Sequence, residues 1–259
     1  MKFAIIIPAS MGSKRLPGKP LVLIGDQTML ERVIEAARKT NAENVLVATT
    51  DDIIQNICIG NIDHYQSKQK HKSGTSRCAE AVKAIDPSID LIVNWQVDEP
   101  FLSPGDVLDM VNMVSSWAPE EQATTIGTIV GPGGGDACPH CSYGHIQRGG
   151  GSGPCTECYG GHSKHVVKVA RGIAGNRCYW FSRAPMSSAC NHIGVYCYHR
   201  NLLEKLALVK ESYPSQQEHL EQLDWLVAGY KIQASFAGVG PRSINTHWDY
   251  EQALKGLPS

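Results

Sequence analysis

Three basic side chains near the start of the chain, Lys14, Arg15 and Lys19, stand in a short loop shaped by glycine and proline residues. The loop follows the apolar run at 3–8, which lacks polar alternation and is therefore typical of a strand buried on both faces. In open α/β sheets, ligands bind at loops that follow the carboxyl ends of such strands. Fixed cations there suit a polyanion, most simply a nucleoside triphosphate; a solvated basic turn is the alternative.

An acidic side chain follows a second apolar run in the same way. The run at 91–94 leads to Gln96 and then to Asp98. A carboxylate at the end of a buried strand faces the same edge of the sheet as the basic loop, and Mg²⁺ prefers one or two carboxylates together with substrate phosphates. Asp98 is therefore a candidate anchor for Mg²⁺, and the alternative is an aspartate that caps a turn.

Four cysteines in a glycine-rich segment have the spacing of a metal site. Cys138, Cys141, Cys155 and Cys158 form C-x₂-C-x₁₃-C-x₂-C. Two close pairs joined by a flexible loop can close a tetrahedral site of four sulfurs, which favours Zn²⁺ with no open position, so the zinc would be structural. Free or disulfide-paired thiols are the alternative. The other cysteines lie in or beside apolar runs and are predicted to be core thiols: Cys58, Cys78, Cys178, Cys190 and Cys197.

The elements that must position these groups alternate between strands and helices. Strands are predicted at 3–8, 44–49, 91–94, 123–130, 165–169, 177–183, 194–198 and 231–237, and helices at 28–39, 51–59, 74–85, 103–116, 202–211, 216–228 and 249–255. This order predicts one α/β domain over 1–259, with a mostly parallel sheet that helices cover on both faces. The segment 131–161, nearly free of aliphatic residues, is predicted to be a zinc-binding insertion in that domain.

Charge and hydropathy argue against nucleic-acid and membrane partners for this protein. The 259 residues carry a formal net charge of −1, so no overall basic field recruits nucleic acid or an anionic membrane surface. The sequence has no apolar stretch of transmembrane length, and its opening apolar run is too short for the core of a signal peptide. We therefore expect a cytoplasmic protein without nucleic-acid or membrane partners.

Seven runs, taken together, resemble one enzyme family. They are IIPASMGSKRLPGKPL (6–21), HKSGTSRCAE (71–80), IVNWQVDEP (92–100), VKVA (167–170), YWFSRAP (179–185), HIGVYCYHRNLLEKL (192–206) and EHLEQL (218–223). In this order they resemble the 3-deoxy-manno-octulosonate cytidylyltransferases, or CMP-Kdo synthetases. The resemblance implies a nucleotide-diphospho-sugar-transferase-like fold, a homodimer, and transfer of CMP from CTP to the acidic sugar Kdo with release of pyrophosphate.

The resemblance also implies roles for individual residues. Arg15, Lys19 and Asp98 would be catalytic, and Asp98 would hold Mg²⁺ together with Asn245. The residues that would contact the nucleotide are Pro8, Ala9, Ser10, Lys14, Ser73, Gly74, Thr75, Arg77 and Gln96. The residues that would contact the sugar are Arg183, His192, Tyr196 and Glu218.

The chain departs from the family pattern at three places. Ser10 stands where the family has an arginine, and Lys14 is the candidate replacement for its charge. Asn245 stands where the family has the second magnesium aspartate; its amide oxygen can still bind Mg²⁺, and the alternative is a cap of the last helix. Ser215 and Gln216 change the approach to the sugar pocket. A different sugar (a pentose or a sugar 1-phosphate), UTP in place of CTP, and a catalytically degenerate scaffold with a zinc lobe therefore stay open as alternatives.

Overall fold

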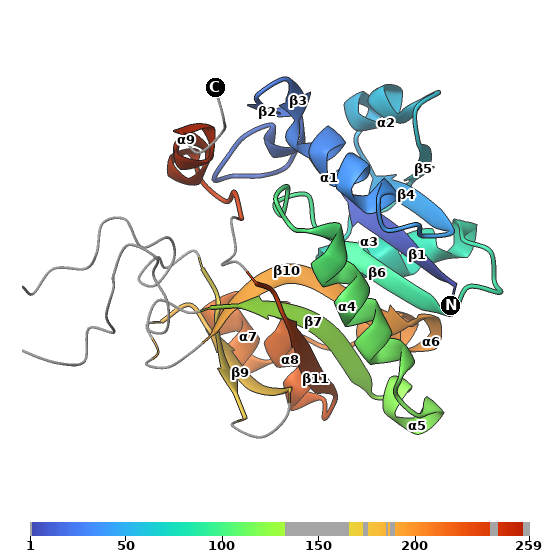
Figure 1. Cartoon of the computed structure of the whole chain (residues 1–259), viewed down its shortest axis with the longest axis vertical. Coiled ribbons are helices and arrows are strands. Elements are labelled where there is room, and N and C mark those ends of the chain that lie inside the picture. Colours follow the sequence, from blue (N-terminus) through green and yellow to red (C-terminus); the bar gives the residue numbers. More distant parts are fainter. Residues whose placement is uncertain are drawn as a thin grey trace, which may run out of the picture.

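A nine-stranded sheet forms the centre of the molecule (Figure 1). The computed structural model describes residues 2–132, 166–172, 176–184, 186, 190–238 and 243–255. In spatial order the strands are β5 (Asp63–Gln66), β4 (Asn44–Thr49), β1 (Phe3–Pro8), β6 (Leu91–Trp95), β10 (Cys190–His199), β7 (Thr125–Gly131), β11 (Lys231–Phe236), β9 (Arg177–Ser182) and β8 (Lys168–Arg171). A small hairpin, β2 (Leu23–Ile24) with β3 (Gln27–Thr28), stands apart from it.

The sheet is parallel in its first half and mixed in its second. Strands β5, β4, β1 and β6 run parallel, which confirms the predicted alternation of strands and helices. Strand β10 then runs antiparallel to both β6 and β7, and β9 runs antiparallel to β11 and β8. Apolar runs predict that strands exist but carry no information about their direction. The antiparallel pairings of β10 and β9 could therefore not be predicted from the sequence.

Helices cover both faces of the sheet. The helices are α1 (Met29–Arg38), α2 (Asp52–Cys58), α3 (Gly74–Ala81), α4 (Pro104–Ser115), α5 (Pro119–Gln122), α6 (Arg200–Leu206), α7 (Tyr213–Glu218), α8 (Glu221–Val227) and α9 (His247–Lys255), with short 3₁₀ helices η1 (Lys19–Leu21) and η2 (Val82–Ala84). Ile5 and Ile7 of β1 pack in one core with α1, α2 and α4, whereas Ala4 and Ile6 pack in the other core with α3, α6 and α8. Within the described residues, every helix is too short or too polar to span a bilayer.

Side-chain caps explain where the helices that frame the site begin. Thr28 caps α1 and Ser73 caps α3, each in a reciprocal capping box, and Ser103 caps α4 with Pro104 in its first turn. The helix predicted at 216–228 is instead two helices, α7 and α8. They are separated at His219, whose left-handed backbone (φ 53°) ends α7.

The predicted zinc lobe lies outside the described residues. Cys138, Cys141, Cys155 and Cys158 belong to 133–165, so the zinc site and the insertion stay predictions. The prediction for the other cysteines is confirmed, since all five lie within or against the core: Cys58, Cys78, Cys178, Cys190 and Cys197.

Candidate active site

The basic loop and the end of β6 meet at one ion pair. Lys19 begins η1, and Gly18 before it has a left-handed backbone (φ 68°) that a residue with a side chain rarely adopts. The Lys19 Nζ atom lies 2.7 Å from Asp98 Oδ2, and the two side chains are only 12% and 20% exposed. The loop after β1 and the loop after β6 therefore share one edge of the sheet, and a cation and a carboxylate are close together there.

Asn245 lies beside this pair on the segment that leads into α9. The main-chain N–H of Ile244 donates to the carbonyl of Asp98 at 2.9 Å, and Arg15 Nη2 donates to Asn245 Oδ1 at 3.2 Å. The interpretation of Asn245 as a helix cap is wrong, because the hydroxyl of Thr246 accepts from the N–H of Asp249, whose carboxylate accepts from Thr246 in return. The Asn245 side chain instead faces the basic loop.

These oxygens fit a magnesium ion that substrate phosphates help to hold. Asp98 supplies a carboxylate and Asn245 an amide oxygen, both hard donors of the kind that Mg²⁺ prefers. Within the described part of the chain, no three or more His, Cys, Asp or Glu side chains gather into a metal site. A protein-only metal cage is therefore absent from that part, and two protein oxygens completed by a triphosphate match how Mg²⁺ is commonly bound.

The S-G-T-x-R segment lies at the N-terminus of α3 and is packed against the other candidate nucleotide residues. A Cβ atom on Gly74 would lie 3.3 Å from the Pro8 ring and 3.8 Å from Gln96 Nε2, so the backbone approaches both closely. Ser73 Oγ and Thr75 Oγ1 donate to the two carboxylate oxygens of Glu221, at 2.5 and 2.8 Å. The segment thus links the loop after β1 to the first residue of α8.

The other residues predicted to contact the nucleotide differ in their burial and in their hydrogen bonds. Burial lowers the pKa of Arg77, and the charge of Asp51 opposes that shift. Ala9 is buried and its N–H donates to the carbonyl of Ala48 at 2.9 Å. Ser10 Oγ accepts from the N–H of Gly12 at 3.2 Å, while Lys14 is exposed. The Ser10 side chain therefore makes a hydrogen bond within its own loop.

A polar cavity of about 220 Å³ adjoins the ion pair. It is open on one side and is lined by Arg15, Gln96, Asp98, Glu99, Val166, Val167, Arg183, His192, Gly194, Tyr196, His219, Leu220, Glu221, Gln222, Ser243 and Asn245. A β-bulge shifts the register of β10 against β7 between Ile193 and Tyr196. Such bulges re-aim side chains beside active sites, and this one separates the two β10 side chains that line the cavity, His192 and Tyr196.

Arg183 lines the cavity and is supported from behind. Glu218 accepts from Ser182 Oγ at 2.6 Å and from the Arg183 N–H at 2.8 Å, and its main-chain carbonyl accepts from Arg183 Nε at 3.0 Å. Lys168 Nζ donates to the carbonyls of Val166 and Arg183. Glu218, predicted to contact the sugar, therefore holds Arg183 in place and does not line the cavity itself.

Burial sets the charge state of several groups in the cavity. It lowers the pKa of His192 to about 3, a shift that the charge of Arg183 increases, so the imidazole is neutral and shares a hydrogen bond of 2.9 Å with Thr128. Burial, and then the charge of Asp98, raises the pKa of Glu99 to about 8. Burial also raises the pKa of Glu221 and of Tyr196, whose hydroxyl accepts a short hydrogen bond from Gln222.

Comparison with known proteins decides the family. The sequence model of the family described as Cytidylyltransferase matches residues 4–132. A 3-deoxy-manno-octulosonate cytidylyltransferase of Alteromonas mediterranea is 30% identical over 275 residues, covering 99% of this chain and 100% of that protein. One of the same name from Parabacteroides distasonis is 31% identical over 274 residues, covering 99% and 98%. This chain belongs to the 3-deoxy-manno-octulosonate cytidylyltransferase family.

Solved structures agree with that assignment. The cytidylyltransferase matches a CMP:2-keto-3-deoxy-manno-octonic acid synthetase complexed with CTP, with a TM-score of 0.78, 26% identity and 98% coverage of both chains. It also matches a 4-diphosphocytidyl-2C-methyl-D-erythritol synthase of Anaerococcus prevotii, with a TM-score of 0.60 at 14% identity, which bears on the fold alone. The predicted nucleotide-diphospho-sugar-transferase-like fold and the predicted enzyme class are thus confirmed.

Sequence reasoning missed five polar residues that line the cavity of the cytidylyltransferase. They are Glu99, His219, Glu221, Gln222 and Ser243. Glu99 Oε1 accepts from the N–H of Gly194 at 2.8 Å and from Ser243 Oγ at 2.6 Å, so it ties β10 to the segment that carries Asn245. A signal for Glu221 was present, because the run EHLEQL offers two glutamates. Only the break between α7 and α8 decides which of them faces the cavity.

Proposed function

We propose that this cytidylyltransferase transfers CMP from CTP to the anomeric hydroxyl of Kdo, or of a Kdo-like acidic sugar, with release of pyrophosphate. The observation that carries the proposal is the Lys19–Asp98 pair, with Arg15 and Asn245 beside it, next to a cavity that Asp98 and Arg183 both line. The cations Lys19 and Arg15 suit a triphosphate, and the cavity lined by Arg183 suits a sugar that carries a carboxylate. The relatives described above are named for the same sugar, which supports this choice of substrate.

The reaction would need no covalent intermediate on the enzyme. The sugar oxygen attacks the α-phosphorus of CTP in line and loses its proton, and the bond to the bridging oxygen of pyrophosphate breaks. Lys19 and Arg15 are placed to offset the negative charge that develops on the phosphate and leaving oxygens. Asp98 and Asn245 would hold Mg²⁺, which supplies further neutralisation of phosphate charge when bound.

The cavity supplies the groups for sugar recognition. Arg183 is held rigidly by Glu218 and can pair with a sugar carboxylate. His192 stays neutral, so it can exchange hydrogen bonds with a hydroxyl without adding charge. Tyr196, Gln222 and Glu221 offer further donors and acceptors on the same wall. A ligand with one carboxylate and several hydroxyls would satisfy this set.

One observation keeps a second substrate in view. Glu221 and Glu99 are carboxyl groups of the same cavity, and Asn245 brings no negative charge to the metal site. The carboxyl groups favour a sugar without a carboxylate, such as a pentose. The loss of the aspartate charge at Asn245 and the Ser10 loop leave a sugar 1-phosphate and UTP as the other alternative substrates. The Lys19–Asp98 ion pair beside the cavity argues against a scaffold without activity. The homodimer and the structural zinc lobe remain part of this proposal.

Pyrophosphate release separates these candidates. The purified enzyme is assayed with CTP or UTP against Kdo, a pentose phosphate and a hexose 1-phosphate, with and without Mg²⁺. The proposal expects release only with CTP, Mg²⁺ and Kdo or a closely related acidic sugar. Release with the pentose phosphate or the hexose 1-phosphate but not with Kdo would overturn the sugar assignment.

A further inference from the structure

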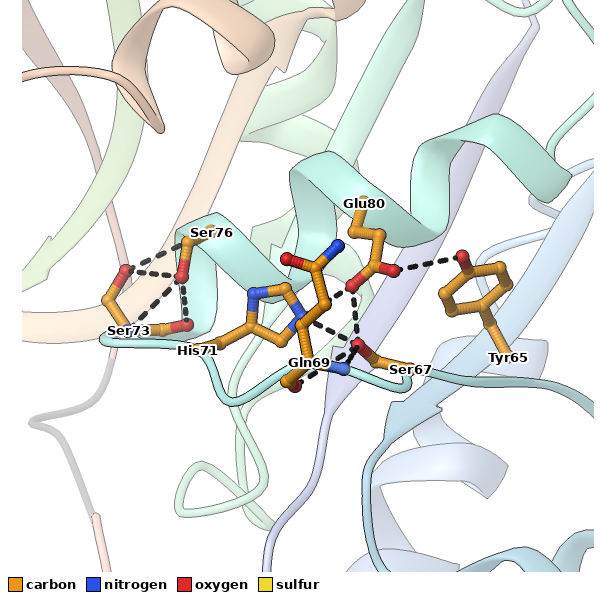
Figure 2. A network of polar contacts seen from close by, with 7 residues as sticks. All are labelled: Tyr65, Ser67, Gln69, His71, Ser73, Ser76 and Glu80. Carbon is orange, nitrogen blue, oxygen red and sulfur yellow. Dashed lines mark hydrogen bonds and ion pairs between the residues drawn. The ribbon is translucent and has the colours of Figure 1, made fainter.

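A partly buried polar cluster fastens the segment before Ser73 to the helix that follows it (Figure 2). His71 Nε2 lies 2.6 Å from Glu80 Oε2 and 2.8 Å from Ser67 Oγ, and Ser67 donates a short hydrogen bond to the same carboxylate. The side chains of His71 and Glu80 are 9% and 15% exposed. Tyr65 of β5 donates to the other carboxylate oxygen at 3.2 Å. The end of β5, the loop and α3 are thus joined at one carboxylate.

The cluster is built to hold the backbone and not to activate a nucleophile. In a catalytic triad the serine and the acid contact different ring nitrogens of the histidine. Here Ser67 Oγ and Glu80 both lie against Nε2 of His71, and Ser67 Oγ also accepts from the N–H of Gln69 at 3.1 Å. Burial alone would raise the pKa of Glu80, but hydrogen bonds from Ser67, His71 and Tyr65 lower it overall, which keeps the carboxylate an acceptor.

The backbone that the cluster holds is the entry to the nucleotide segment. His71 precedes Ser73 by two residues, and Ser73 caps α3 through a capping box with Ser76 (Figure 2). Glu80 lies near the other end of the same helix. The cluster therefore fixes the path of the chain into α3. Close packing makes that path critical, because a Cβ atom on Gly74 would lie only 3.3 Å from the Pro8 ring.

We propose that His71 is a positioning residue for the nucleotide, acting through Glu80 and Ser67 to hold the segment 73–77 against Pro8 and Gln96. This inference rests on the proposed role of 73–77 in nucleotide binding. His71 touches no reacting group; its effect is to pre-order the backbone that CTP contacts.

The test compares His71→Ala with His71→Gln. The Nε2 amide of glutamine reaches as far from the backbone as the Nε2 of histidine, so His71→Gln keeps a donor for Glu80, whereas His71→Ala removes it. We expect His71→Ala to raise KM for CTP about tenfold or more, with kcat and the KM of the sugar changed far less. His71→Gln should restore most of the loss. The double variant with Glu80→Ala should be no worse than the more affected single variant.

A second histidine–carboxylate pair supplies the control. His199 Nε2 lies 3.8 Å from Asp90 Oδ1, and the two residues flank the paired ends of β10 and β6, away from the Asp98 end of the sheet. His199 also caps α6, so His199→Ala should lower the thermal unfolding temperature without changing KM for CTP. Unfolding temperatures are recorded for every variant.

Two results would overturn the positioning role. The first is a folded His71→Ala enzyme whose KM for CTP stays within about twofold of the wild-type value. The second is a His71→Gln enzyme as impaired as His71→Ala. Direct titration of CTP by calorimetry tests the positioning role of His71 separately from the proposed sugar. Wild-type enzyme that binds CTP but does not turn over Kdo would refute the sugar assignment and leave the role of His71 testable. A weaker affinity of His71→Ala for CTP supports the positioning role in either case.

Discussion

Replacing Lys19 by methionine removes one charge from the centre of the site while keeping most of the side-chain volume. Lys19 Nζ and Asp98 Oδ2 are 2.7 Å apart, and neither side chain is more than 20% exposed. At that separation and an effective dielectric constant of ~20, the attraction is about 6 kcal/mol. The cost of removing both charges from water offsets much of this attraction, so the net loss of folding stability should be roughly 1–3 kcal/mol.

The loss of activity should be larger than this loss of stability suggests. A domain with a typical stability of about 5–15 kcal/mol remains folded after losing 1–3 kcal/mol. The missing cation, however, no longer offsets charge that develops in the transition state, and removing one such donor typically lowers kcat about 10²–10³-fold. Lys19→Met should therefore be a folded enzyme with a kcat reduced by about this factor.

An exposed lysine–carboxylate pair of similar length gives the matched control. Lys39 Nζ lies 2.6 Å from Glu35 Oε1 on α1, but the side chains are 62% and 48% exposed. An exposed pair of this kind contributes about 0.3–0.5 kcal/mol, so Lys39→Met should change neither kcat nor stability appreciably. Pyrophosphate release at saturating CTP and sugar gives kcat for both variants, and urea unfolding gives the free energy of unfolding.

Two outcomes would refute the reasoning. If kcat of Lys19→Met stays within about threefold of the wild-type value, the ion pair is structural and the cation does not act on the phosphates. If Lys39→Met loses as much activity as Lys19→Met, the loss follows from removing any lysine pair and not from the site.

Three other substitutions test separate parts of the account. Asn245→Asp should lower the Mg²⁺ concentration for half-maximal activity, because a carboxylate binds the ion more strongly than an amide; a magnesium titration measures this. Wild-type protein should lose up to roughly 5 kcal/mol of unfolding free energy as pH falls from 6.5 towards 3, because the unfolded chain binds a proton that buried His192, with its folded pKa of about 3, does not; His192→Asn should abolish this loss, and urea unfolding at neutral and acidic pH measures it. Cys138→Ser with Cys155→Ser should abolish bound zinc, as elemental analysis of the purified chain would show.

The strands and helices that repeat a clear pattern could be predicted from the sequence. The strand β1 and the helix α1 are each marked by a pattern among neighbouring residues, and their bounds were predicted to within a residue. Strand β5 was missed because its four residues, DHYQ, are polar or only partly buried at the edge of the sheet. The division between α7 and α8 was missed because a left-handed His219 has no strong sequence signal.

Part of the site could be predicted: Arg183, His192 and Tyr196, which line the cavity, were named from the family resemblance. Lys19 and Asp98 each follow an apolar strand, so their meeting at one sheet edge follows from the general rule for parallel strands. Glu221 and Gln222 come from a helix whose start depends on the break at His219, and Glu99 depends on the bulge of β10. Such contacts arise from tertiary packing, and no local pattern in the chain encodes them.

The identity of the product tests the central claim most directly. The enzyme is incubated with CTP, Mg²⁺ and Kdo, and phosphorus-31 NMR follows the loss of the triphosphate signals. The account predicts equal amounts of pyrophosphate and of a phosphodiester that joins CMP to the anomeric oxygen of Kdo. Unchanged CTP with Kdo, together with formation of a nucleotide sugar from a neutral sugar or from UTP, would contradict it.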